Sequence, residues 1–224
     1  MVHLHRLINS ESPDLILLQE TKCIDDLFPH IPGYTNLISG QKSYNGVAIL
    51  VKETHSATKW EVITIAELDQ KRYIEAVIDD LTYASVYVPC GGGDLDKFMY
   101  KLKFLEELAS IVKNISTSKI VIGGDWNVAL HDADVQHVDR YIDSVLCVPP
   151  VRERFARILD LGLTQEGKTG DWTWWDYRSP MSGLRLDCFL TANQSGSVRT
   201  LTEYRRTEVD GVKPSDHVPV IFEF

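Results

Sequence analysis

Acidic and imidazole side chains in this chain stand directly beside short apolar runs. The clearest case is Ser215-Asp216-His217, which precedes the apolar residues 218–224 at the end of the sequence. Three further polar clusters interrupt apolar runs in the same way: Gln19-Glu20-Thr21-Lys22, Gly124-Asp125-Trp126-Asn127 and Arg185-Leu186-Asp187. Because rigid strands hold the side chains at their ends in fixed positions, four such clusters indicate strand ends that converge on one polar site.

Glu20 follows the apolar run 15–18 and is expected to emerge at the carboxyl end of a strand. Mg²⁺ prefers hard oxygen ligands and commonly takes one or two carboxylates from a protein. Glu20 is therefore a candidate metal ligand. A surface or helix-capping glutamate remains the alternative interpretation of this residue alone.

The segment Gly123-Gly124-Asp125-Trp126-Asn127 offers a carboxylate and an amide two residues apart. In an extended chain, Asp125 and Asn127 would point to the same side. Such a pair suits hydrolysis, because the acid takes or relays a proton while the amide orients the attacking water. An Asx-type turn after a strand is the alternative for this segment.

Asp187 and His217 form a plausible pair for charge stabilisation. A carboxylate bonded to one ring nitrogen fixes the tautomer of a histidine and stabilises its protonated form. A protonated His217 would stabilise charge on a phosphoryl oxygen, whereas a satisfied structural histidine is the alternative. The sequence has no Gly-x-Ser-x-Gly, His-Glu-x-x-His or phosphate-loop motif, which leaves metal-assisted hydrolysis by activated water.

Length and composition set the frame for this site. The chain has 224 residues, 44% of them hydrophobic, and a net charge of −9. These values predict one domain over residues 1–224 with a packed core. The negative charge argues against an indiscriminate electrostatic grip on nucleic acid but suits a site that collects Mg²⁺. No apolar stretch approaches the roughly 20 residues of a membrane span. The four cysteines are widely spaced, so we expect a reducing cytoplasm.

Strand and helix patterns alternate along the chain. Short apolar runs predict strands at 15–18, 46–51, 73–78, 82–88, 120–122, 186–190 and 218–224, the third and fourth forming a hairpin. Helical spacing predicts helices near 4–8, 98–112 and 151–159. Strands outnumber helices and several are apolar on both faces. The pattern therefore favours an α/β sandwich in layers.

Five ordered motifs resemble the endonuclease/exonuclease/phosphatase superfamily. They are residues 17–22, 124–127, 174–179, 183–187 and 215–219. The segments Trp174-Trp175-Asp176-Tyr177-Arg178-Ser179 and Gly183-Leu184-Arg185-Leu186-Asp187 resemble its exonuclease III branch of abasic-site DNA repair nucleases. The resemblance covers nearly the whole chain. It implies a four-layered αββα sandwich of two mixed β-sheets flanked by helices.

The resemblance also assigns roles to individual residues. It implies that Glu20 and Asp216 hold the metal, Mg²⁺ with Mn²⁺ as a substitute. The implied catalytic residues are Tyr87, Asp125, Asn127, Asp187 and His217. Arg72, from the basic pair Lys71-Arg72 that could hold a nucleic-acid backbone, is a candidate substrate-binding residue, and the resemblance implies three more: Trp174, Leu184 and Leu186. The last three would form the apolar pocket for a base-less sugar, which an intact base does not fit.

The chain departs from the family pattern in two places. Members of the family usually begin with a strand that carries a Trp-Asn motif, and no residue here matches it. We therefore expect the fold without this first strand. Cys90 stands where relatives commonly carry an amide that contacts DNA, and a thiol is a weaker hydrogen-bonding group.

The expected activity is Mg²⁺-dependent hydrolysis of the phosphodiester 5′ of abasic sites, with 3′-to-5′ exonuclease and 3′-phosphatase activity. The partner would be double-stranded DNA with abasic sites or 3′ ends, bound by a monomer in the cytoplasm, or at the nucleoid in a bacterium, with no membrane involved. Two alternatives stay open: a phosphodiesterase for phospholipids or inositol phosphates, and an inactive DNA-binding relic.

Overall fold

A computed structural model describes residues 1–65, 70–115, 119–178 and 181–224. Ser179, the last residue of the motif that begins at Trp174, lies outside these ranges. The helices are α1 (Val2–Glu11), α2 (Leu95–Ile115), α3 (Val138–Tyr141) and α4 (Pro149–Leu159). The strands are β1 (Leu15–Gln19), β2 (Tyr34–Ser39), β3 (Val47–Lys52), β4 (Ala57–Val62), β5 (Tyr73–Ile78), β6 (Leu81–Tyr87), β7 (Ile120–Asp125), β8 (Thr164–Gln165), β9 (Trp174–Asp176), β10 (Ser182–Leu184), β11 (Asp187–Ala192), β12 (Ser197–Thr200) and β13 (Val220–Glu223).

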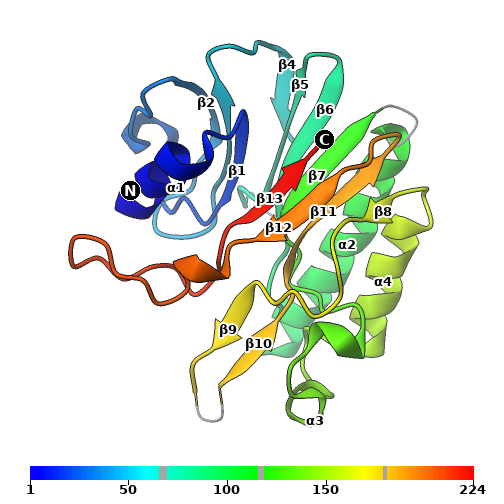
Figure 1. Ribbon diagram of the computed structural model, residues 1–224. Coiled ribbons are helices and arrows are strands. Elements are labelled where there is room, and N and C mark those ends of the chain that lie inside the picture. Colours follow the sequence, from blue (N-terminus) through cyan, green and yellow to red (C-terminus); the bar gives the residue numbers. More distant parts are fainter. Residues whose placement is uncertain (66–69, 116–118, 179–180) are drawn as a thin grey trace.

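The strands form layers, as the sequence predicted (Figure 1). A six-stranded sheet has the order β4-β5-β6-β7-β11-β8, and its β6–β7 pair is parallel. A three-stranded sheet has the order β1-β3-β2, and β12 pairs with β13. The pairs of the three-stranded sheet are antiparallel, so mixed pairing among the described residues belongs to the six-stranded sheet.

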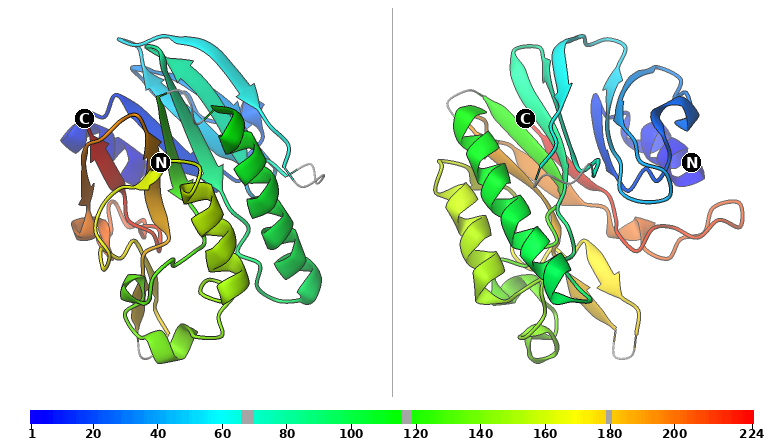
Figure 2. Two further views of the ribbon diagram at one scale, coloured as in Figure 1. Left: turned by 90° about the vertical axis from the view of Figure 1, so that its right-hand side faces the viewer. Right: turned by 180° about the vertical axis from the view of Figure 1, so that it is seen from behind.

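Helices cover the outer faces of both sheets. The helices α2 and α4 lie together against the six-stranded sheet (Figure 2). Leu102, Leu105 and Leu108 of α2 recur at helical spacing and are buried in this layer. The helix α1 covers the three-stranded sheet, where its Leu4 and Ile8 pack against buried residues of that sheet. The expected αββα order is therefore confirmed.

The predicted hairpin is formed by β5 and β6. Its two connecting residues, Asp79 and Asp80, have φ values of 49° and 63°. Positive φ at both central positions is the signature of the tight turn that matches strand twist. The strand β6 then runs parallel to β7, and Tyr87 is the register partner of Asp125. This pairing places the two predicted catalytic residues side by side at the carboxyl ends of β6 and β7.

The boundaries of β7 and β11 differ from the expected ones. We expected a strand at 120–122 that ends in Gly123-Gly124, and β7 runs through both glycines and one residue further, to Asp125. A Cβ atom on Gly124 would collide with the backbone of Val86, so only glycine allows this continuation. We also expected a strand at 186–190, but Asp187 is the first residue of β11. Among the described residues, no helix is long and apolar enough to span a membrane.

Candidate active site

Two carboxylates form the floor of the site. Asp125 ends β7 and Asp187 begins the antiparallel β11, and the two residues are register partners. Asp125 is buried with 6% of its surface exposed, and Asp187 is half-buried. The predicted convergence of strand ends therefore holds for this pair, which sits where the six-stranded sheet opens toward the loops.

Asn127 contacts Asp125 through a turn, which was the alternative interpretation of this segment. The chain is not extended here, because Asn127 has a φ of 48°. Its backbone N–H donates to Asp125 Oδ1 at 2.9 Å, and its side-chain Nδ2 donates to Oδ2 at 3.0 Å. The expected extended conformation is wrong: an Asx-type turn brings the amide beside the carboxylate. A second bond from Nδ2 to the Val88 carbonyl fixes the amide.

His217 is oriented by Asp187, as predicted. The distance from His217 Nδ1 to Asp187 Oδ2 is 2.8 Å. Thr173 donates its hydroxyl proton to the same oxygen at 2.6 Å and accepts backbone N–H groups from Leu186 and Asp187. Sequence reasoning missed Thr173, although its place directly before Trp174 puts it at the start of a motif. The Thr173 hydroxyl thus fixes the orientation of the Asp187 carboxylate, and this carboxylate fixes the orientation of the His217 ring.

Burial and charge shift the pKa values of this group in opposite directions. Burial raises the pKa of Asp125 to about 7, although the nearby His217 charge opposes the rise. Burial lowers the pKa of His217, but the charge and hydrogen bond of Asp187, aided by Asp125, outweigh it and raise the value to about 10. At neutral pH the imidazole is therefore a cation, and the Asp125 carboxyl is poised to exchange a proton.

Glu20 lies on the opposite wall and contacts Tyr87. The Tyr87 hydroxyl donates to Glu20 Oε1, and Lys22 Nζ lies 2.6 Å from Oε2. Burial, together with the bond to Glu20, raises the pKa of Tyr87 far above its ordinary value, so the phenol stays protonated. Arg72 packs its guanidinium 4.6 Å from the centre of the Tyr87 ring and donates to the Tyr87 carbonyl. Arg72 therefore supports Tyr87 directly.

Asp216 and Trp174 are joined at the edge of the site. Trp174 Nε1 donates to Asp216 Oδ2 at 2.8 Å, and Trp174 forms an isolated bridge with His217. Leu184 and Leu186 are buried, with 0% and 3% exposed, and Trp174 packs against their cluster. The three residues predicted for the apolar pocket thus share one cluster, in which Trp174 is the more exposed member.

Lys101 is a buried cation beneath this floor that sequence reasoning missed. Its Nζ donates to the carbonyls of Asn127 at 2.6 Å, Val145 at 2.9 Å and Cys90 at 3.1 Å. Burial lowers the pKa of Lys101 to about 8. The signal was present in the sequence, because Lys101 falls on the apolar stripe of α2, four residues before Leu105. The Lys101 ammonium group thus bonds to three separate loops and stabilises the turn at Asn127.

The donor groups of this site fit a hard divalent cation. Carboxylate and imidazole atoms of Asp125, Asp187 and His217 lie within 4.8 Å of one another. Both oxygens of Asp125 accept hydrogen bonds from Asn127, and Asp187 Oδ2 accepts from Thr173 and lies in contact with His217. Glu20, in contrast, is paired with an exposed lysine that a cation could replace. Oxygen-rich, partly solvated donors of this kind suit Mg²⁺ better than softer metals.

The layered fold and the polar cleft at the ends of its strands define an α/β enzyme. The model of the Endonuclease/Exonuclease/phosphatase family matches residues 1–217, and the chain belongs to this family. Exodeoxyribonuclease III of Haemophilus influenzae is 30% identical over 253 residues, which cover 99% of this chain and 93% of the relative. These findings make the protein a hydrolase of the nuclease type.

Two solved structures show the same fold in detail. A 3′ phosphatase from Neisseria bound to a product DNA hairpin is 31% identical, with a TM-score of 0.89 over 100% of this chain and 93% of the neighbour. An AP endonuclease from Archaeoglobus fulgidus is 28% identical, with a TM-score of 0.85 over 98% and 91% of the two chains. The likeness extends across the sheets that carry the candidate site.

Proposed function

We propose that this protein is a Mg²⁺-dependent DNA repair nuclease that hydrolyses the phosphodiester 5′ of abasic sites, with 3′-to-5′ exonuclease and 3′-phosphatase activity. The observation that carries the proposal is the Asp125–Asn127 pair beside a protonated His217. The named relatives, which include an exodeoxyribonuclease III and an AP endonuclease, support DNA as the substrate.

Each residue has a defined task in the proposed reaction. Asp125 accepts the proton of the attacking water, for which its raised pKa makes it a suitable base. Asn127 orients that water through its amide. His217 donates a hydrogen bond to the scissile phosphate and stabilises the charge that grows there, because Asp187 keeps its ring protonated. Tyr87 donates its phenolic proton toward the same group.

Glu20 and Asp216 are the proposed ligands of the metal. Glu20 Oε2 is paired with the exposed Lys22, and Asp216 is an exposed carboxylate that accepts one hydrogen bond from the half-buried Trp174. A bound Mg²⁺ would neutralise phosphate charge and lower the pKa of a coordinated water. The ion would also reverse the local field of a chain with a net charge of −9 and so allow an anionic strand to approach.

The apolar cluster of Trp174, Leu184 and Leu186 is the proposed pocket for the base-less sugar. An abasic nucleotide leaves the duplex at low cost, because no base pair or stacked base holds it. An intact nucleotide would have to place a base against buried leucines. Selection for damaged sites would therefore come from this cluster, while the hydrolytic step would come from the floor.

The test is incision of an end-labelled duplex that contains a central tetrahydrofuran analogue of an abasic site. With Mg²⁺ we expect a single cut 5′ of the analogue, and EDTA should abolish it. Asp125→Asn should reduce turnover about 10³-fold, since it removes the proton acceptor. Asp143→Asn, an exposed change outside the site, is the matched control. Incision that persists in Asp125→Asn, or no cleavage of DNA by the wild-type protein, would contradict the proposal.

A further inference from the structure

A hairpin and a loop meet beside the candidate active site. The hairpin consists of β9 and β10, and the loop is the segment 201–219 between β12 and β13 (Figure 1). The backbone N–H of Trp175 donates to the Asp216 carbonyl at 3.3 Å, and Trp174 forms its bridge with His217. The junction of hairpin and loop therefore borders the site directly.

The two faces of β9 have different surroundings, because successive side chains of a strand point to opposite sides. Trp174 packs in the apolar cluster of the site, whereas Trp175 packs with Tyr204 of the loop. The face that carries Trp175 is thus next to the site but turned away from its apolar cluster. A group bound on this face would be a neighbour of the nucleotide in the site.

Two adjacent arginines of the loop stack on aromatic rings of the hairpin. The guanidinium carbon of Arg205 lies 4.5 Å from the centre of the Trp175 ring. That of Arg206 lies 4.8 Å from the centre of the Tyr177 ring. The negative face of an aromatic ring attracts a cation, and the N–H groups at the edge of the stacked guanidinium still point outward. The rings therefore hold both cations in place without neutralising them.

The hydrogen-bond acceptor that these arginines share is a weak one. Arg205 and Arg206 both donate to the sulfur of Met181, and a thioether is a poor acceptor. Within the part of the chain that the structure describes, neither arginine forms a salt bridge, although Glu203 and Glu208 belong to the same loop. An anionic oxygen would therefore be a stronger partner than the sulfur.

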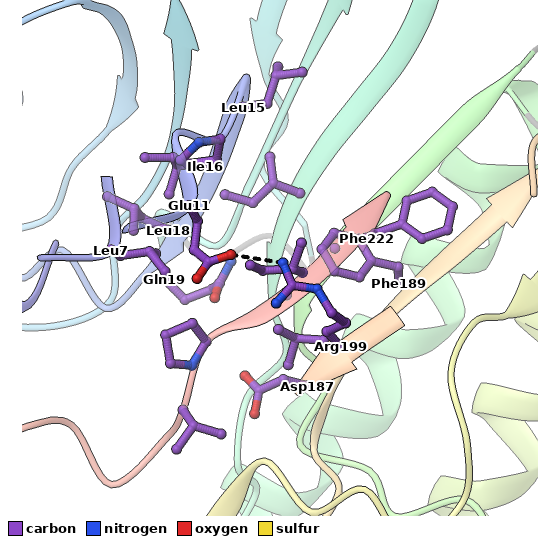
Figure 3. Close-up of a pocket in the computed structure, with 18 of the residues that line it drawn as sticks. Leu7, Glu11, Leu15, Ile16, Leu18, Gln19, Asp187, Phe189, Arg199 and Phe222 are labelled. Carbon is purple, nitrogen blue, oxygen red and sulfur yellow. Dashed lines mark hydrogen bonds and ion pairs between the residues drawn. The ribbon is translucent and has the colours of Figure 1, made fainter. Parts of the chain in front are cut away.

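Arg199 of the neighbouring strand β12 shows the contrast. Its guanidinium meets Glu11 at 2.8 Å, as Figure 3 shows, and Glu223 at 3.3 Å. Two carboxylates thus neutralise this cation, and it has little affinity left for another anion. The two loop arginines keep their charge available, and Arg206 is also exposed to solvent.

We propose that Arg205 and Arg206, held on two aromatic rings of the β9–β10 hairpin, bind the phosphodiester backbone of duplex DNA on one flank of the nucleotide in the candidate site. This inference rests on the function proposed above. A planar guanidinium matches two phosphate oxygens with parallel hydrogen bonds. In a chain with a net charge of −9, such local cations supply the attraction that the whole surface does not.

The direction of β9 places this surface a few base pairs from the site. Tyr177 follows Trp174 by three positions, and an extended chain advances about 3.3 Å per residue, so the two lie roughly 10 Å apart. Each strand of a DNA duplex carries one phosphate per about 3.4 Å of helix axis. Arg206 would therefore meet phosphates about three base pairs from the cleaved position, on the flank toward which β9 runs and not on the other.

The test measures binding of a fluorescein-labelled duplex with a central tetrahydrofuran analogue, with Ca²⁺ in place of Mg²⁺ to separate binding from cleavage. Arg206→Gln should weaken binding at least about fivefold by fluorescence anisotropy. It should also reduce the slope of log Kd against log salt by about one, since one phosphate contact is lost. Arg157→Gln removes the same charge from an exposed position of α4 and is the matched control. With Mg²⁺, Arg206→Gln should raise KM and leave kcat unchanged.

A second pair of duplexes locates the contact. Neutral methylphosphonates replace about four neighbouring phosphates on one flank of the analogue in the first duplex, and on the other flank in the second. We expect the loss from Arg206→Gln to disappear with one of these duplexes and to persist with the other, because two changes to the same contact are not additive. Tyr177→Leu removes the ring that holds Arg206 and should show the same flank dependence with a smaller loss.

The outcomes separate this surface from the proposed function. Equal binding by Arg206→Gln and Arg157→Gln would overturn the surface. A loss that persists with both modified duplexes would also overturn it, because the effect would then belong to the overall charge of the chain. If abasic DNA is still incised in either case, the nuclease function stands. A loss of binding confined to one flank, in a protein that hydrolyses no DNA, would support the surface and refute the function.

Discussion

The strands β7 and β13 have nearly the same apolar sequence but very different surroundings. β7 contains Ile120-Val121-Ile122, of which at most 2% is exposed at any residue. β13 contains Val220-Ile221-Phe222, and all three residues are half-buried. The difference lies in their neighbours, because among the described residues β7 is paired on both edges and β13 on one. Burial of a strand is thus decided by its partners as much as by its own residues.

The active site is built across this difference. Asp125 and Asp187 stand on the closed six-stranded sheet and are held by Asn127 and Thr173. Glu20 follows β1 and Asp216 precedes β13, and both carboxylates are exposed. We therefore expect the hydrolytic step to depend most strongly on Asp125 and Asp187, and the placement of metal and substrate to depend on Glu20 and Asp216.

The largest effect on activity is expected at His217, which precedes β13 and bonds to Asp187 of β11. His217→Ala should lower kcat about 10²- to 10³-fold, because it removes a charged donor to the transition state. The imidazolium also lowers the pKa of Asp125, which burial raises to about 7. The carboxylate is the active form, so activity falls as pH drops below this pKa. Without His217 the acid limb of the kcat–pH profile should move to higher pH.

His137→Ala is the matched control for this experiment, because His137 is exposed and its side chain makes no cap hydrogen bond. It should leave both kcat and the acid limb unchanged. In the wild-type protein, a second decline is expected near pH 10, where His217 loses its proton. If the acid limb keeps its position in His217→Ala, the charge of His217 does not affect the pKa of Asp125, and the proposed coupling between the two residues is wrong.

The floor could be predicted from the sequence to a large extent. A carboxylate at the boundary of an apolar run marked Asp125, which ends β7, and Asp187, which begins β11, since strand ends are marked by a local change of residue type. The turn at Asn127 was the alternative interpretation of its segment, and spacing alone did not decide for it, because its positive φ depends on bonds to Asp125 and Val88. The same holds for Thr173, whose role arises from residues 14 positions away.

The pairing of β12 with β13 was less predictable for a different reason. The apolar run at 218–224 indicated a strand but not its partner, and β12 was not expected at all. Its four residues, Ser197–Thr200, alternate without a strong apolar face. Pairing across a sheet depends on residues far apart in the sequence, so local patterns do not reveal an open edge.

A smaller effect is expected for the buried cation under the floor. Lys101→Met keeps the length of the side chain but leaves three carbonyls without their donor, which should destabilise the fold by about 3 kcal/mol. Because one of these carbonyls belongs to Asn127, kcat should fall severalfold while KM changes little. Thermal unfolding and steady-state kinetics measure the two effects. Lys101→Arg should restore part of kcat if the loop contacts matter, and a pure loss of stability with normal kcat would refute the positioning role.

The smallest effect is expected for Arg199, an exposed cation that makes as many hydrogen bonds as Lys101. Arg199 contacts Glu11 once and Glu223 twice, at 2.8 to 3.4 Å, but its side chain is 46% exposed. Water replaces such contacts readily, so Arg199→Gln should change kcat by less than about twofold and leave the melting temperature nearly unchanged. The pair Lys101→Met and Arg199→Gln compares three hydrogen bonds of a buried cation with three of an exposed one. A larger loss of stability from Arg199→Gln than from Lys101→Met would show that the exposed contacts between α1, β12 and β13, rather than the buried contacts of Lys101, limit the stability of this fold.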